Sequence, residues 1–130
     1  MDPAEEQRLL EEKTGKALAE ARTNLDIALD ELSRSGTDLV KKVWLAEEAA
    51  EYSSLLYSLT YGLEDEDPPA PVRKRNADPS MLVKESDEQL RLATNLRDKT
   101  PLKGYGHLRA AVYKLRQSHH ILERAELRKG

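Results

Sequence analysis

The stretch ALAEARTNLDIALDELSRSGTDLV, residues 17–40, decides the fold of this 130-residue chain. Its small and apolar side chains recur at steps of three and four residues, the period of one helix face: Leu18, Ala21, Leu25, Ala28 and Leu32. The sequence SRSG then interrupts this face, with Gly36 as the predicted left-handed residue. Thr37 or Asp38 is a candidate cap for a second helix. A connection this short predicts an antiparallel helical hairpin.

The first helix is predicted over about residues 3–34. Asp2 is a candidate cap and Pro3 fits the first helical position. The second helix is predicted over about residues 38–63. Its apolar positions form a broad stripe, which indicates neighbouring helices on two sides.

The second half of the chain predicts two more helices after a change in composition. Residues 64–80 are charged and rich in proline, which predicts a flexible linker. Helices are predicted over about residues 79–99 and 105–128, with a turn containing Gly104 and Gly106 between them. The predicted fold is therefore all-α: one domain over residues 1–130, an antiparallel four-helix bundle of up-down-up-down order.

The composition fits such a bundle and excludes several kinds of site. Hydrophobic residues make up 38% of the chain and charged residues 35%, as expected for amphipathic helices. No cysteine is present, which excludes disulfides, thiolate metal sites and a thiol nucleophile. Apolar runs are short, and acidic residues follow Met1 where a signal peptide needs basic ones. We therefore expect a soluble, cytoplasmic protein with no membrane partner.

Charge is divided unequally between the two halves of the chain. Residues 1–67 contain 17 acidic and 7 basic side chains, and residues 68–130 contain 7 acidic and 14 basic ones. Opposite charges favour packing of the two halves against each other, within one chain or between two copies.

Five carboxylates are the candidate metal ligands: Glu47, Glu48 and Glu51 in the order E-E-x-x-E, and Glu64 and Asp67 in the order E-x-x-D. The pattern resembles the metal motif of MazG-like all-α nucleotide pyrophosphohydrolases. That resemblance implies a magnesium-dependent nucleotide hydrolase with these residues as ligands. In that family, however, the second motif stands on its own helix, whereas Glu64 and Asp67 precede Pro68 and Pro69, where a helix cannot continue. We therefore favour a solvated helix face, without metal or cofactor.

The histidines do not form an obvious metal site. His119 and His120 are adjacent and point about 100° apart on a helix, and His107 lies too far along the chain to join them. His119 continues the apolar face of the last helix, so we expect it to be partly buried in the bundle.

Basic residues give a second alternative function. The candidate phosphate contacts are Arg73, Lys74, Arg75, Arg109 and Arg116. They are compatible with a nucleic-acid-associated accessory protein that uses the basic C-terminal half. The overall acidity of the chain, with a net charge of −3, argues against strong nucleic-acid binding.

Helical faces are the best candidates for partner binding. Trp44, Tyr52, Tyr57 and Tyr61 all fall on the second helix, and aromatic side chains often anchor interfaces. Leu18 and Leu25 belong to a first helix that is predicted to be longer than the third and fourth, so part of its apolar face would stay uncovered. We therefore predict a homodimer, and a non-enzymatic interaction module: an adaptor, regulator or assembly subunit.

Overall fold

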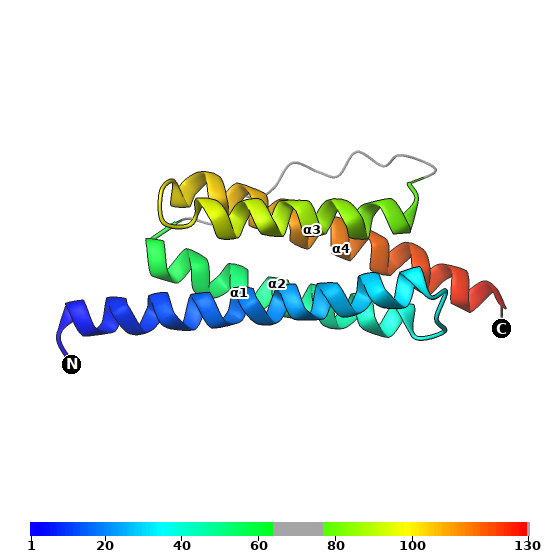
Figure 1. The fold of residues 1–130 in the computed structure, drawn as a ribbon, viewed down its shortest axis with the longest axis horizontal. Helices are drawn as coiled ribbons and strands as arrows, with labels where there is room; N and C mark the ends of the chain where they lie inside the picture. Colours follow the sequence, from blue (N-terminus) through cyan, green and yellow to red (C-terminus); the bar gives the residue numbers. More distant parts are fainter. Residues whose placement is uncertain (64–76, 130) are drawn as a thin grey trace.

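The computed structural model describes residues 1–63 and 77–129, and within these ranges the chain folds as four α-helices packed against one another (Figure 1). They are α1 (Pro3–Ser33), α2 (Leu39–Tyr61), α3 (Pro79–Leu96) and α4 (Pro101–Lys129). The predicted all-α fold is confirmed. Most of the predicted linker lies outside the described residues, and α3 already begins at Pro79, inside the range assigned to it.

α1 and α3 each begin at an aspartate cap, and the cap of α1, Asp2, is the predicted one. The Asp2 carboxylate accepts a hydrogen bond from the Glu5 backbone N–H at 2.8 Å, and the Asp78 carboxylate accepts one from the Ser80 N–H at 2.9 Å. A proline follows each aspartate, at a position that has no N–H to satisfy. Each cap contributes about 1 kcal/mol, because it satisfies a donor that the helix itself leaves without an acceptor.

The turn after α1 takes its left-handed conformation at Ser35, where φ is 52°, and not at the predicted Gly36. The Ser35 N–H donates to the Leu32 carbonyl, and the Gly36 N–H donates to the Glu31 carbonyl. This is the hydrogen-bond pattern of a Schellman motif, in which the left-handed residue comes one position before the second donor. The prediction for Gly36 was wrong by one residue.

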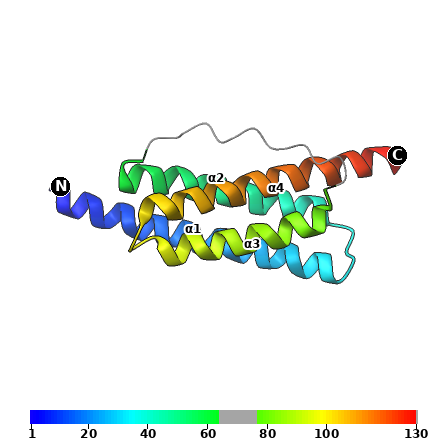
Figure 2. The ribbon, with the colours of Figure 1, turned by 90° about the horizontal axis from the view of Figure 1, so that it is seen from above.

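Four contacts each join the first half of one helix to the second half, or the C-terminal cap, of a neighbour: Thr14–Thr60 (α1–α2), Tyr57–Pro101 (α2–α4), Ser118–Pro79 (α4–α3) and Arg97–Glu11 (α3–α1). Each helix is therefore antiparallel to both neighbours, and the order around the bundle is α1, α2, α4, α3 (Figures 1 and 2). α2 and α3 lie on a diagonal and point the same way.

In chain order the helices run up-down-down-up, so the predicted up-down-up-down order was wrong. That order needs short connections between consecutive helices. The chain between Tyr61 and Pro79 is long enough, at about 3.3 Å per extended residue, to return along the whole bundle before α3 begins. A long connection therefore permits α3 to run parallel to α2.

α4 begins at Pro101, earlier than the predicted residue 105, and contains both glycines that were expected to form a turn. Gly104 is buried where α4 crosses α2. A Cβ at this position would lie 2.3 Å from the Tyr57 hydroxyl and 3.2 Å from the Ala93 carbonyl oxygen. The Tyr57 hydroxyl fills this space and donates to the Pro101 carbonyl at 3.0 Å. Gly104 therefore serves a close approach between helices and not a turn.

The core runs through all four helices and consists mainly of leucine, valine and alanine: Leu18, Ala21, Leu25, Ala28, Val43, Ala46, Ala50, Val83, Leu90, Ala93, Leu108, Ala111, Val112 and Leu115. α4 has 29 residues and nearly matches α1, which has 31. The apolar face of α1 is covered along its middle mainly by its neighbours α2 and α3, and Leu18 and Leu25 are 2% and 0% exposed. Neither is available to a second copy of this fold, which corrects the predicted set of contact residues.

Candidate interaction surface

The outward face of α2 carries four exposed apolar side chains, which we call the α2 stripe: Trp44, Tyr52, Leu55 and Leu59. Their exposed fractions are 43%, 55%, 57% and 59%. At 100° per residue they fall within an arc of about 80° on one side of the helix, and Glu48 lies between the first two. α2 therefore offers to solvent a largely apolar face, interrupted by Glu48, in addition to the faces that it packs against α1 and α4.

Beside the α2 stripe, charged side chains join α2 to α4, and we call them the α2–α4 charge cluster: Glu47, Glu51, Arg109, Arg116 and His119. Arg116 contacts Glu51 at 2.8 Å and Glu47 at 3.4 Å. Arg109 contacts Glu51 at 3.4 Å and donates to the Ser54 hydroxyl at 3.0 Å. Pairing of each carboxylate with a cation from the facing helix fixes the register of α2 against α4.

His119 lies within this cluster, as a partly buried histidine, as predicted. Its Nδ1 is 3.0 Å from a Glu47 carboxylate oxygen, and its Nε2 is 3.2 Å from Glu123 one turn further along α4. The His120 ring stacks on it, with 5.8 Å between the ring centroids. Both ring nitrogens of His119 therefore face carboxylates, which orients the ring across the α2–α4 boundary.

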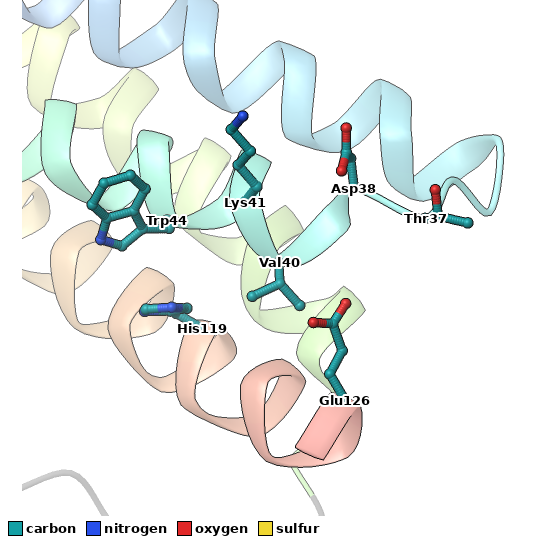
Figure 3. Close-up of a pocket in the computed structure, with 7 residues that line it drawn as sticks. All are labelled: Thr37, Asp38, Val40, Lys41, Trp44, His119 and Glu126. Carbon is teal, nitrogen blue, oxygen red and sulfur yellow. The ribbon is translucent and has the colours of Figure 1, made fainter. Parts of the chain in front are cut away.

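Two open hollows adjoin the α2 stripe. The first, of about 340 Å³, lies beside Trp44 at the start of α2, with His119 and Glu126 of α4 on its other side (Figure 3). The second, of about 330 Å³, lies between Tyr52 and Leu55 of α2 and Tyr105 and Arg109 of α4. Both are shallow depressions along the α2–α4 boundary, so the same surface carries the apolar stripe and the two grooves.

The aromatic residues predicted to bind a partner divide into two groups. Trp44 and Tyr52 are on the surface, whereas Tyr57 is 0% exposed and Tyr61 is partly buried. Burial, with the neighbouring Tyr61 second, raises the pKa of Tyr57 to about 12. Arg97 donates to the Tyr61 hydroxyl at 2.8 Å. Tyr57 and Tyr61 therefore hold the bundle together.

Sequence reasoning counted Leu55 and Leu59 in the broad apolar stripe of the second helix and did not identify them as surface residues. Their spacing in the sequence could have identified them: residues 44, 48, 52, 55 and 59 are separated by steps of four and three and therefore lie on one helix face. Core positions on α2, such as Val43, Ala46 and Ala50, follow a different face.

The carboxylates of the E-E-x-x-E pattern do not converge on one point. Glu47 and Glu51 turn to the cations of α4, while Glu48 is exposed on the outward face. Glu64 and Asp67 lie outside the described residues. Within residues 1–63 and 77–129, no group of three or more histidine, aspartate or glutamate side chains is placed to hold a metal ion. The arrangement that the MazG-like resemblance implies is thus not seen in the described part of the chain.

Two of the five candidate nucleic-acid residues belong to the α2–α4 charge cluster. Arg109 and Arg116 bind glutamates of α2, and each guanidinium lies within 6 Å of the Tyr113 ring centroid, at 5.7 and 5.6 Å. Arg73, Lys74 and Arg75 fall outside the described residues. The two arginines of α4 have intramolecular partners that a phosphate would have to displace.

Comparisons with protein families, with characterised proteins and with solved structures find no match to this chain. Among the described helices, none combines the length and the apolar character that crossing a membrane requires. A functional proposal for this chain therefore rests on its surface geometry.

Proposed function

We propose that this chain is a non-enzymatic helical interaction module that self-associates through the α2 stripe. The observation that carries the proposal is the gathering of four exposed apolar side chains on one face of one helix. Isolated apolar side chains are normal on protein surfaces, but contiguous ones mark interaction sites. A role as an adaptor, regulator or assembly subunit agrees with such a surface.

The size of the α2 stripe supports this proposal. With roughly half of each side chain exposed, the four residues leave on the order of 400 Å² of apolar surface in water. A specific interface buries about 800 Å² per partner, with an apolar centre and a polar rim. The stripe is large enough to form much of that centre, with Glu48 as one charged residue inside it and Lys41 beyond its Trp44 end, where a rim is needed.

Light scattering of the purified chain tests the proposal directly. We expect a mass of twice the 14.7 kDa chain at micromolar concentration. The change Leu55→Glu places a charge in the centre of the stripe, and we expect it to give a monomer with an unchanged helical circular dichroism spectrum.

Leu92→Glu is the matched control, because Leu92 is an exposed leucine on α3, 41% exposed and away from the stripe. It should leave the mass unchanged. A wild-type chain that stays monomeric at several hundred micromolar would refute self-association.

A further inference from the structure

Resting on the proposed function, we infer that Glu48 restrains self-association through the α2 stripe and makes it dependent on pH, so that the dimer tightens as the pH falls. Glu48 is an exposed carboxylate that lies among the four apolar side chains of the stripe. This role does not depend on the relative orientation of the two copies.

The position of Glu48 means that a surface covering the stripe also covers its carboxylate. Glu48 lies one helical turn from Trp44 and one turn from Tyr52, about 6 Å along the helix in each direction. Around the helix it lies between these two aromatic residues, about 40° from each. A second copy that buries Trp44 and Tyr52 therefore removes water from Glu48 as well.

Glu48 brings no bound cation into such an interface. Within the described part of the chain it makes no hydrogen bond or ion pair, in contrast to its neighbours Glu47 and Glu51. Arg109 and Arg116 of α4 bind those two carboxylates. The E-E-x-x-E pattern therefore contains two glutamates that hold α4 and one that faces solvent.

The surroundings of Glu48 offer little compensation for its charge. On α2, Lys41 lies two turns away, about 10 Å along the helix axis. From α4, Arg109 lines the second hollow together with Glu48, but side chains of α2 already bind it. On α1, Asp26 lies at the level of Glu48 and is another exposed carboxylate. The titratable residues that line this hollow with Glu48 are Glu51, Tyr52, Tyr105 and Arg109.

Association of two copies thus desolvates two Glu48 carboxylates without pairing them. Burial of a charged group in apolar surroundings is unfavourable, whereas its neutral form is tolerated much better. The ionised form of Glu48 therefore opposes association, and the protonated form opposes it far less. By linkage, a dimer that favours the protonated form takes up protons as it forms, so its stability rises as the pH falls.

Sedimentation equilibrium of the complete chain tests this inference. We expect the natural chain to dimerise roughly 10-fold more tightly at about pH 5 than at about pH 7.5. Glu48→Gln removes the titrating group and the buried charge. We expect this variant to dimerise roughly 10-fold more tightly than the natural chain at about pH 7.5, with little further change at the lower pH.

Glu88→Gln is the matched control for the loss of one negative charge. Glu88 is an exposed glutamate on α3, which lies diagonally opposite α2 in the bundle. This variant should keep the affinity and the pH dependence of the natural chain. The three histidines are present in all three chains, so their titration cancels in the comparison.

Two results would overturn the inference and leave the proposed function standing. In the first, Glu48→Gln and the natural chain form dimers of equal affinity at both pH values. In the second, Glu48→Gln weakens the dimer, which would show that Glu48 pairs with a cation of the second copy. If the natural chain and Glu48→Gln both stay monomeric, self-association itself is refuted.

Discussion

The substitution Gly104→Ala tests how α4 packs on α2. In an unobstructed helix this change stabilises by about 1 kcal/mol, because alanine restricts the unfolded chain and favours the helix. Here the new Cβ would lie 2.3 Å from the Tyr57 hydroxyl, and Tyr57 is 0% exposed and has no free space to enter. Overpacking of a core costs ~1–3 kcal/mol, and displacement of the hydroxyl also breaks its hydrogen bond to Pro101, worth about 1 kcal/mol. We expect net destabilisation of about 1–3 kcal/mol, since the lost hydrogen bond and the helix preference of alanine nearly cancel.

Gly106 supplies the matched control on the same helix. A Cβ at Gly106 meets no atom within 4 Å, so Gly106→Ala should stabilise by about 1 kcal/mol. Urea unfolding followed by circular dichroism measures both changes, and the two midpoints should move in opposite directions.

A double-mutant cycle then assigns the effect to Tyr57. In a Tyr57→Phe background the clashing oxygen is absent, and the Ala93 carbonyl oxygen at 3.2 Å becomes the nearest atom, a tight contact that offsets the helix preference of alanine. Gly104→Ala should there be nearly neutral, which gives a coupling energy of about 2 kcal/mol. If Gly104→Ala stabilises the natural chain as much as Gly106→Ala does, the close packing of α4 on Tyr57 is wrong.

Three further predictions concern the helix ends, the charge cluster and alkaline pH. Gly62→Ala should lower stability by about 1 kcal/mol in thermal unfolding, because φ is 62° at this residue and a Cβ strains that conformation; no change would contradict the left-handed helix end. Glu47→Gln should lower the free energy of unfolding in urea by about 1 kcal/mol, because it weakens the contacts with His119 and Arg116. The control Glu48→Gln, at an exposed residue, should stay within about 0.5 kcal/mol of the natural chain. Equal effects of the two changes would refute the pairing of Glu47 with α4. The pKa of Tyr57 rises from 10.0 to about 12 on folding, so its neutral form stabilises the fold below pH 10 and this contribution is lost as the pH rises to 12. The natural chain should therefore lose stability relative to Tyr57→Phe over that interval, and parallel pH profiles would count against a buried Tyr57.

The local features of the fold could be predicted from sequence because they depend on neighbouring residues. The cap at Asp2 and the restart at Asp78 each need one carboxylate and one proline at fixed positions. The apolar period of α1 likewise placed Leu18 and Leu25 on one helix face, but they were predicted as contacts with a second copy, whereas the neighbouring helices bury them within one copy.

The arrangement of the helices depends on contacts between residues far apart in the chain. Gly104 and Gly106 are typical of a turn in sequence, and only the approach of Tyr57 from α2 explains Gly104 inside a helix. The length of the α2–α3 connection is compatible with either direction of α3. Contacts such as Arg97 with α1 settle that direction, and no local pattern predicts them.

The candidate surface was predicted in part, for a reason that lies in α2 itself. Trp44 and Tyr52 stood out as aromatic residues, but Leu55 and Leu59 could not be separated from core leucines, because α2 is apolar on more than one face. Two neighbouring helices account for two of these faces. The outward face of α2 could be identified only from the positions of α1 and α4 in the folded bundle.

The outward faces of the other helices show that folding alone does not require the α2 stripe. Each helix in this bundle has two neighbours and one face toward solvent. On α1 that face is mixed, with the exposed Glu12, Lys16 and Asp30 beside the exposed Leu9 and Ile27. On α3 it is also mixed, with the exposed Lys84, Glu88 and Arg91 beside the exposed Met81 and Leu92. Polar residues on α2 would serve the fold of one copy equally well, because these positions bury little against α1 or α4. Four large apolar side chains in their place expose surface that water disfavours, at about 25 cal/mol per Å². That free energy is recovered only when another surface covers the stripe, which is why we propose the α2 stripe as the binding surface of this chain.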